Sequence, residues 1–351
     1  MTTDKSDVSG LVDHLFRREA GKMVAYLTRV FGVGNLRMAE DVVQDTLLRA
    51  LETWPVYGVP ENPPAWLMRV ARNRAIDIVR RDGRFRHIAP EAERDLAAKD
   101  PGSDERAAFA NEIRDDQLRM MFSCCHPSLS TEAQMTLILK TLCGFGVAEI
   151  AHALLAGEDS IEKRLSRARN VLRSSGSFVE IATAPDIPER LEAVYRAIYL
   201  LFNEGYHGTR AEETVREELC FEAIRLALLL SEHTESAGPR TYALLALFCF
   251  QAARLPGRTT EDGGLVQLGL QDRSNWDRDL IGRGFYFLTM SSSGDDISEF
   301  HIEAAIASLH CSARSYEETD WGRILELYDT LYSMAPSPIV ALNRAVALGN
   351  A

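Results

Sequence analysis

The stretch MAEDVVQDTLLRALET, residues 38–53, decides the fold class of this chain. Its apolar face is formed by Ala39, Val42, Val43, Thr46, Leu47, Ala50 and Leu51. Its other face carries Glu40, Asp41, Gln44, Asp45, Leu48, Arg49 and Glu52. Because the apolar residues recur every three or four positions, we predict an amphipathic α-helix that buries the first face and exposes the second.

The same periodicity runs through most of the chain on both sides of this stretch, and strand signals are nearly absent. We therefore predict an all-α protein. Four prolines make residues 54–64 a loop, because proline blocks helix continuation. The other expected helices span residues 11–31, 64–81, 115–124, 130–143, 147–155, 160–173, 188–202, 213–230, 239–253, 276–290, 299–313, 321–332 and 338–348.

Charge is distributed unevenly along the 351 residues. The chain has 39 Lys and Arg against 51 Asp and Glu, a net charge of -12, which by itself argues against a nucleic-acid partner. Residues 177–351 contain 14 basic and 26 acidic residues, so they hold the whole acidic excess. A composition boundary therefore follows residue 176, and the first half, which is neutral overall, remains a candidate for binding nucleic acid.

Other classes of protein are disfavoured by the sequence. The first seven residues lack the pattern of a signal peptide, and no apolar run approaches the roughly 20 residues that a membrane helix needs. The six cysteines show no Cys-x-x-Cys spacing, and the sequence Cys124-Cys125-His126 is only weak evidence for a metal site. We expect a soluble protein of the reducing cytoplasm, with buried free thiols and with no metal or cofactor.

The first basic unit lies within residues 63–86, where seven arginines face two aspartates. Apolar residues repeat there at helical spacing, so one face should pack while the rest presents guanidinium groups, which suit phosphates and base edges. Trp54 and Tyr57 precede this unit and offer rings on which an unstacked base could rest. The alternative is an amphipathic helix with a solvated basic face.

The second basic unit spans residues 146–173. A short apolar helix leads to the turn at residues 156–159, Ser160 is a plausible N-cap, and the following helix carries five basic residues against Glu162. This order indicates a helix-turn-helix, whose second helix enters the major groove. An ordinary helical hairpin is the alternative.

Three motifs together resemble the bacterial RNA polymerase sigma factors of the extracytoplasmic-function (ECF) type, over about residues 10–175. Residues 39–50 resemble the family's core-polymerase-binding helix. Residues 66–77, followed by Arg80 and Arg81, are similar to its minus-ten-element helix, and residues 161–169 to its minus-35 recognition helix. The resemblance implies two small helical sigma domains, residues 1–86 and 113–176, joined by a linker at 87–112.

The resemblance also implies the site residues. The residues expected to bind polymerase are Asp41, Gln44, Asp45, Leu48 and Arg49. The residues expected to bind minus-ten DNA are Trp54, Tyr57, Asn62, Trp66, Arg69, Arg72, Asn73, Arg80 and Arg81. The residues expected to bind minus-35 DNA are Ser160, Glu162, Lys163, Arg164, Ser166, Arg167 and Arg169. The implied partners are core RNA polymerase and promoter DNA, and the implied function is promoter-specific transcription initiation without catalysis by this chain.

Residues 177–351 resemble the helical, tetratricopeptide-like C-terminal extension of one sigma subgroup. Stacked helical repeats cover one another's apolar faces, yet the last apolar helix has no following partner, which favours a shortened chain or an end covered by another molecule. The acidic surface either docks on the basic units and modulates them or only keeps the repeats soluble; an unknown protein effector is the other partner considered.

Two further classes of function are weighed against a sigma factor. A helix-turn-helix regulator that acts without polymerase would need the DNA-binding units but not the helix at residues 38–53. An enzyme would need a metal or phosphate motif, and the histidines supply no such spacing.

Overall fold

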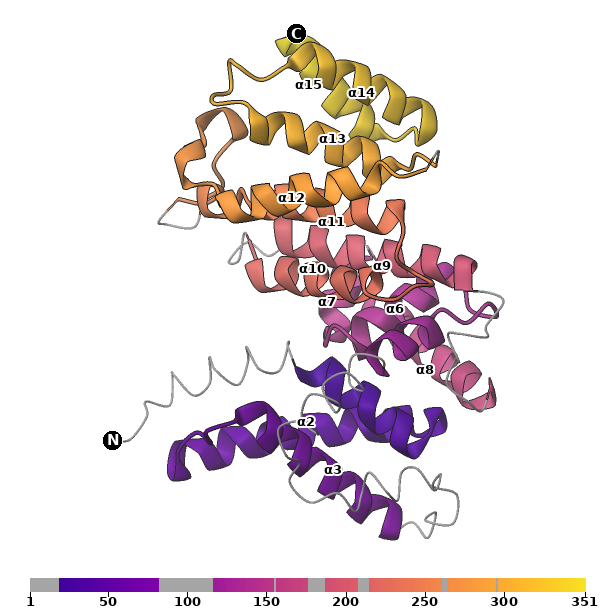
Figure 1. Cartoon of the computed structure of the whole chain (residues 1–351). Coiled ribbons are helices and arrows are strands. Elements are labelled where there is room, and N and C mark those ends of the chain that lie inside the picture. The colour runs from indigo at the N-terminus through magenta and orange to yellow at the C-terminus, as the bar shows by residue number, and fades with distance from the viewer. Residues whose placement is uncertain are drawn as a thin grey trace. The chain divides into compact units, whose positions relative to one another are not determined.

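The computed structural model describes residues 19–81, 116–154, 156–175, 187–207, 215–260, 264–294 and 296–351. Within these ranges the regular elements are helices and there is no β-strand, so the prediction of an all-α fold is confirmed. The chain divides into two compact units, residues 1–197 and 198–351 (Figure 1). The predicted linker at 87–112, together with Arg84 and Arg86, lies outside the described residues.

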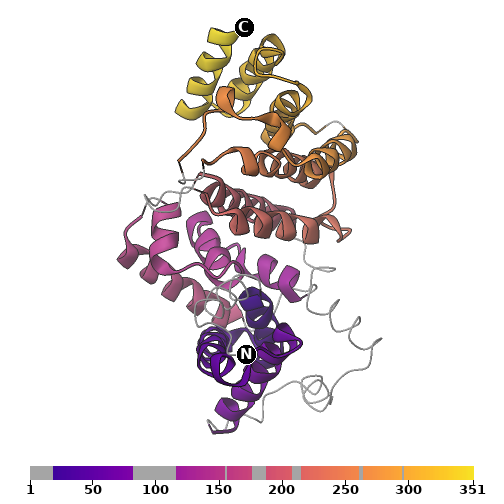
Figure 2. The same cartoon turned by 90° about the vertical axis from the view of Figure 1, so that its left-hand side faces the viewer.

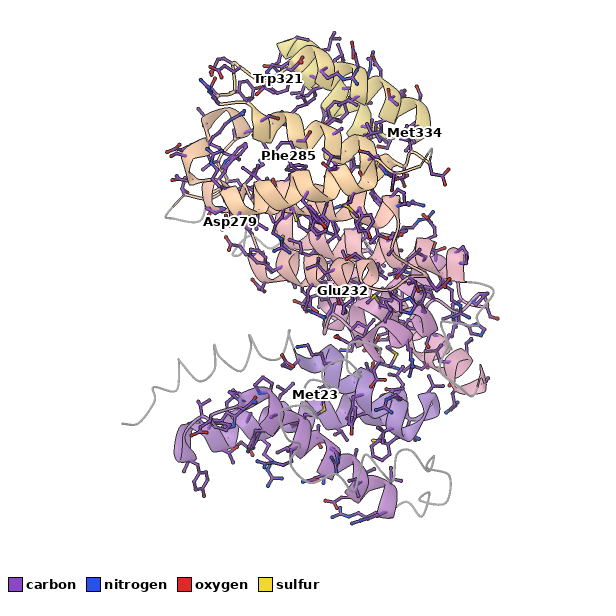
Figure 3. All side chains as sticks on the ribbon, viewed as in Figure 1. Met23, Glu232, Asp279, Phe285, Trp321 and Met334 are labelled. Atoms are coloured by element: carbon purple, nitrogen blue, oxygen red, sulfur yellow. The ribbon has the colours of Figure 1, made fainter. Side chains whose placement is uncertain are left out.

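The first unit begins with an N-terminal module, which we define as residues 19–81. It contains a helix at residues 19–31, the short 3-10 helix η1 (Val33–Asn35), α2 (Leu36–Tyr57) and α3 (Pro63–Arg81). The predicted apolar face of α2 is buried except for Leu51, which is 37% exposed because it lies at the edge of that face, and α3 packs against this helix. Figure 3 shows Met23, which is 1% exposed, on the first of these helices.

Two features of α2 differ from the sequence prediction. The helix continues through Pro55 to Tyr57, where a loop was predicted. Pro55 lies in the last turn, where its missing N–H costs one hydrogen bond, and the Gly58 N–H closes the helix on the Trp54 carbonyl at 3.0 Å. Glu40, predicted on the solvent face, is 8% exposed.

The helix-turn-helix module, which we define as residues 116–175, follows the undescribed linker. Its helices are residues 116–124, α6 (Thr131–Thr141), α7 (Val147–Ala153) and α8 (Glu158–Ser175), and α6, α7 and α8 pack on one another. The last helix begins at Glu158 rather than at the predicted N-cap Ser160. Two acidic residues in the first turn favour this earlier start, because they complement the helix dipole.

The second unit is a stack of helices in which each packs against the next (Figures 1 and 2). It takes in the end of α9 (Ile187–His207) and continues with α10 (Glu217–Ser231), α11 (Pro239–Ala252), α12 (Arg278–Ser291), α13 (Glu299–Ser312), α14 (Trp321–Met334) and α15 (Pro338–Asn350). Short 3-10 helices at Leu255–Gly257, Leu268–Leu270 and Arg273–Asn275 connect α11 to α12.

The core of the second unit is centred on α11, whose Leu244, Leu245, Phe248 and Phe250 are fully buried. A β-carbon at Gly284 would lie 2.6 Å from the Phe250 ring, so glycine allows α12 to approach α11 closely. Within the described residues, no helix is long and apolar enough to cross a membrane. Apolar side chains of α15 are exposed, as the sequence predicted: Ile339, Leu342, Val346 and Leu348.

Candidate nucleic-acid interface

The outer face of α2 presents all five residues predicted to bind polymerase. Asp41, Gln44, Asp45, Leu48 and Arg49 are exposed, and their spacing places them on one side of the helix. The Leu48 side chain is 59% exposed and lies among these polar and charged residues. This face combines an apolar centre with flanking charges, a composition that suits a protein partner.

An exposed ion pair joins α2 to α3 next to this face. The Arg74 guanidinium lies 3.4 Å from an Asp45 carboxylate oxygen, and both side chains are about half exposed. An exposed pair of this kind contributes at most about 1 kcal/mol to folding. Asp45 therefore remains available to a partner at little cost to the fold.

The two aromatic residues that precede α3 lie in different environments. Trp54 is 2% exposed and meets the Trp66 ring edge to face, with centroids 5.5 Å apart. As α2 and α3 stand, Trp54 offers no face to a base, and packing is its observed role. Tyr57 is 84% exposed at the end of α2, where a base could reach its ring.

Helix α3 presents a row of polar residues that starts near its N-terminus. Asn62 accepts a hydrogen bond from the Ala65 N–H at 3.2 Å and thereby caps the helix. Arg69, Asn73 and Arg80 are exposed and lie on one stripe, because four and seven residues separate them. Arg81 is exposed as well, while Arg72 and Trp66 are half-buried.

Helix α8 has a continuous exposed face that carries most of the predicted minus-35 residues. Glu162, Lys163, Ser166 and Arg167 are exposed, whereas Ser160 and Arg164 are half-buried. The opposite face is apolar, with Ile161, Leu165, Ala168 and Leu172 at most 2% exposed. The helix is thus held by one face and presents a polar face of the kind that reads a DNA groove.

Arg169 is half-buried, like Ser160 and Arg164, and it forms an ion pair with the N-terminal module. Its guanidinium Nη2 lies 2.6 Å from Oε2 of Glu40, on α2 of the N-terminal module. Burial raises the pKa of Glu40 above its ordinary value, although Arg169 and Lys140 counteract this. The sequence carried no signal for the pair, because its members are 129 residues apart.

The cysteines and histidines form no metal site in the parts of the chain that the structure describes. All six thiols are free and buried. Burial raises the pKa of Cys124 to about 12, and its sulfur lies 3.5 Å from the Thr141 hydroxyl. Cys124 and Cys125 therefore belong to the packed interior of the helix-turn-helix module.

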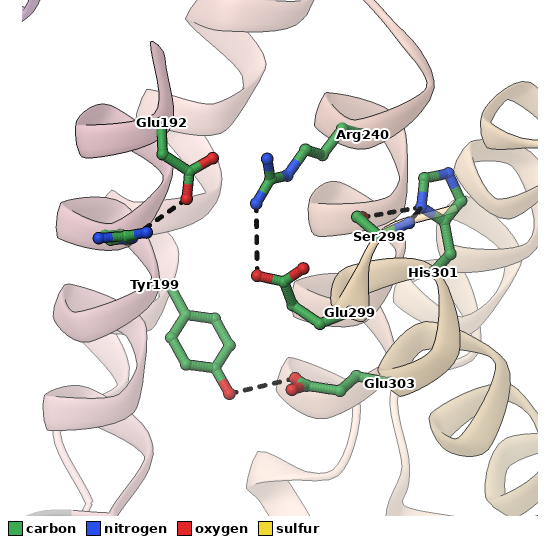
Figure 4. A network of polar contacts seen from close by, with 8 residues as sticks. Glu192, Tyr199, Arg240, Ser298, Glu299, His301 and Glu303 are labelled. Carbon is green, nitrogen blue, oxygen red and sulfur yellow. Dashed lines mark hydrogen bonds and ion pairs between the residues drawn. The ribbon is translucent and has the colours of Figure 1, made fainter. Parts of the chain in front are cut away.

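A second group of polar residues connects helices of the C-terminal unit (Figure 4). The Tyr199 hydroxyl donates to a Glu303 carboxylate oxygen at 3.1 Å, and Arg240 lies 3.3 Å from Glu299. Burial raises the pKa of Glu303 to about 7. These contacts tie α9 and α11 to α13, so we assign them to the packing of this unit.

Comparison with known proteins identifies two parts of the chain. Residues 15–85 match Sigma-70 region 2, and residues 190–292 match a family of unknown function, DUF6596. The uncharacterized protein R00370 of Rhizobium meliloti (strain 1021) is 40% identical over 315 residues, which cover 90% of this chain and 74% of that protein. No solved structure matches.

Relatives with a named activity match chiefly the first half. The ECF RNA polymerase sigma factor SigL of Mycobacterium tuberculosis (strain ATCC 25618 / H37Rv) is 32% identical over 166 residues, covering 47% of this chain and 88% of that protein. SigG, an ECF sigma factor of the same strain, is 27% identical over 227 residues, 59% of each chain.

Proposed function

The chain belongs to the ECF RNA polymerase sigma factors, and from this membership we propose how its helices divide the work of promoter recognition. It is an alternative sigma factor, which works with core RNA polymerase and promoter DNA, and its family is not a family of enzymes. In our proposal α2 docks on polymerase, α3 with Tyr57 holds melted minus-ten DNA, and α8 reads the minus-35 duplex.

The observation that carries this assignment is the separation of buried and exposed residues on α8. Its apolar stripe is buried, while Lys163 and Arg167 point away from that stripe and are exposed. Basic side chains on the free face neutralise phosphates, and each neutralised phosphate makes binding more sensitive to salt. Glu162 and Lys163, near the start of the helix, are placed to contact base edges.

Run-off transcription with matched core polymerase tests the assignment of α8. The double variant Arg164→Glu/Arg167→Glu should abolish transcription from a duplex promoter, because charge reversal repels the phosphates. Arg323→Glu/Arg344→Glu, which reverses two exposed charges in the C-terminal unit, is the matched control and should retain transcription. Full transcription by the α8 variant would refute this role.

Pull-down with core polymerase separates a sigma factor from a regulator that acts without polymerase. The exposed face of α2, with Leu48 at its centre, supports polymerase binding. Retention of the full chain by core enzyme is the expected result. Promoter binding by a chain that core enzyme does not retain would favour the regulator.

The proposal also includes modulation of the sigma domains by the acidic C-terminal part. Residues 177–351 carry a net charge of -12, and the basic helices are the charges they would attract. Because α9 crosses the boundary between the units, and Arg190 on it donates to the Phe122 carbonyl at 2.7 Å, a truncation should keep this helix.

A chain that ends at residue 207 therefore tests modulation, with circular dichroism as the check that its first unit stays helical. Higher affinity for promoter DNA than the full chain would support masking, and lower affinity would support a positive effector role. Equal affinity of the two chains would indicate that the acidic surface serves only to keep the protein soluble.

A further inference from the structure

A cavity in the C-terminal unit lies where α12 begins and α13 ends, and it is lined by arginines. Its volume is about 300 Å³, and its lining includes Arg273, Arg278 and Arg314 together with one carboxylate, Asp272. This volume is at the lower end of the range found for sites that hold small organic ligands. None of these residues belongs to the surfaces assigned to polymerase or DNA.

The arginines of this cavity lack the carboxylate partners that other arginines of the unit have. Residues 177–351 contain 26 acidic residues, and all 14 of their basic residues are arginines. Arg240, Arg323 and Arg344 each form an ion pair with a carboxylate. Within the described part of the chain, none of the three arginines that line the cavity does so. The cavity therefore holds positive charge that no ion pair neutralises.

Arg273 is the fixed member of the three. Its side chain is buried, and its guanidinium donates to the carbonyls of His310 and Ala313 at 2.7 and 2.8 Å. It also donates to the Thr319 hydroxyl at 3.0 Å. These partners are neutral, although carbonyls at the end of a helix such as α13 carry partial negative charge. They hold the guanidinium in place and offset only part of its charge.

Arg254, which follows α11, brings a further positive charge close to Arg273. Their guanidinium carbons lie 5.5 and 5.1 Å from the centroid of the same Trp276 ring, whose electrons attract cations. Burial lowers the pKa of Arg273 from its ordinary value, and the charge of Arg254 lowers it further. Burial also lowers the pKa of His310 to about 3, and both arginines add to this effect. The surroundings of the cavity therefore favour a bound anion.

Arg278 and Arg314 are the lining arginines that can contact a ligand. Both are exposed. Arg278 donates one hydrogen bond, to the Arg273 carbonyl at 3.3 Å, and Arg314 makes none with the described residues. Each guanidinium is a planar fork of N–H donors that fits two oxygens of one phosphate group. Two forks beside the fixed charge of Arg273 form a site suited to phosphate oxygens.

Asp272 sets the net charge of the lining. Its Oδ1 accepts hydrogen bonds from the N–H and the hydroxyl of Ser274, at 2.9 and 2.7 Å. These bonds lower the pKa of Asp272, so it is ionised at neutral pH. Three arginines and one carboxylate leave a charge of +2. A phosphate group whose second pKa is about 6 carries nearly the opposite charge at neutral pH.

We propose that the cavity lined by Arg273, Arg278 and Arg314 binds a phosphate-bearing anion, either free phosphate or the phosphate group of a small organic ester. Arg273 supplies a fixed charge, and the other two arginines contact the phosphate oxygens. The unit as a whole is acidic and repels anions, so binding depends on this local group of arginines. The proposal does not depend on how the chain recognises promoters.

Isothermal titration calorimetry on the full chain tests the proposal, at low ionic strength and about pH 7.5, where phosphate is mostly the dianion. The probes are inorganic phosphate and ribose 5-phosphate, and chloride at equal ionic strength is the reference. Saturable binding of phosphate at one site, without binding of chloride, is the expected result. Tighter binding of ribose 5-phosphate would identify an ester as the ligand, and equal or weaker binding would identify free phosphate. The proposal is overturned if neither probe binds up to about 10 mM.

A double variant locates the bound anion. Arg278→Gln/Arg314→Gln should weaken phosphate binding about tenfold or more, because it removes both forks. Its melting temperature should stay near that of the wild-type chain, since both side chains are exposed. Arg283→Gln removes an exposed arginine of α12 that does not line the cavity, and this control should bind phosphate as the wild-type chain does. Equal phosphate affinity of the double variant and the wild-type chain would also overturn the proposal.

Discussion

Trp54 and Trp66 meet edge to face at the junction of α2 and α3, with ring centroids 5.5 Å apart and planes inclined by 64°. Trp54 is on the last turns of α2, and Trp66 is on the first turn of α3. An aromatic pair of this geometry contributes about 0.5–1.5 kcal/mol beyond the area it buries. The pair therefore fixes the angle at which α3 leaves α2, and with it the position of the polar stripe on α3.

Substitution of Trp54 should act on stability. Trp54→Ala removes a ring that is 2% exposed, and we expect the free energy of unfolding to fall by about 3–5 kcal/mol. Urea denaturation of the full chain, followed by circular dichroism, measures the loss. A change below about 1 kcal/mol would contradict the packing role of Trp54.

Substitution of Tyr57 should act on DNA instead. Its side chain is 84% exposed, so Tyr57→Ala should change stability by no more than about 0.5 kcal/mol. Loss of a base-stacking ring should lower affinity for single-stranded minus-ten DNA by about 1–3 kcal/mol. Fluorescence anisotropy with holoenzyme measures this affinity, and Val56→Ala, which changes another exposed residue beside it, is the control.

Adjacent leucines on α2 should separate folding from polymerase binding. Leu47 is 4% exposed and Leu48 is 59% exposed. Leu47→Ala should cost about 2–5 kcal/mol of stability, whereas Leu48→Ala should leave the melting temperature unchanged and weaken binding to core polymerase. Titration calorimetry with core enzyme and thermal melts measure the two effects. Equal polymerase affinity for Leu48→Ala and the wild-type chain would remove Leu48 from the interface.

The salt dependence of DNA binding should show how many phosphates α8 neutralises. If Arg167 contacts one phosphate, Arg167→Ala should reduce the slope of log affinity against log salt by about 0.9. The measurement is binding of minus-35 duplex by holoenzyme between low and moderate salt. Ser166→Ala, which removes an exposed hydroxyl and no charge, should leave the slope intact. An unchanged slope for Arg167→Ala would place this arginine away from the backbone.

The sequence alone was sufficient to predict the features that depend on a single helix. Periodicity predicted the all-α fold and the buried stripe of α8, because a 3.6-residue repeat places side chains on faces without reference to other elements. It failed at helix ends, where Pro55 and Glu158 are helical, because capping and the last hydrogen bonds depend on detail that periodicity ignores.

The pattern of apolar residues could not predict contacts between distant parts of the chain. Glu40 was predicted to face solvent and Trp54 to face DNA, and both are buried by partners on other helices. An isolated helix gives no sign of which polar residue a second helix will cover. The roles of the exposed residues on α2, α3 and α8 stay predictions until polymerase and DNA are present.

Stability of the C-terminal unit should fall as the pH rises from about 4.5 to 7, and Glu303 is the cause. Burial raises the pKa of this carboxyl from 4.5 to about 7, an effect that Glu299 adds to and the Tyr199 hydroxyl opposes. Between these values the folded chain keeps a proton that the unfolded chain has released. At about 1.4 kcal/mol per pKa unit, the loss is at most about 3 kcal/mol, and it is complete above pH 7.

The variant Glu303→Gln isolates this contribution. It should be more stable than the wild-type chain at pH 8 and should lose this part of the pH dependence, as followed by urea denaturation at pH 5, 6, 7 and 8.

Burial lowers the pKa of His301, and that of His310 to about 3, so both histidines destabilise the fold as the pH falls below 6.5. Because this opposite effect is common to both chains, it cancels in their difference. Glu326→Gln, at an exposed carboxylate that pairs with Arg323 and does not affect the pKa of Glu303, is the control. A stability difference that does not change with pH would show that Glu303 is ionised throughout and pairs more strongly than its burial suggests.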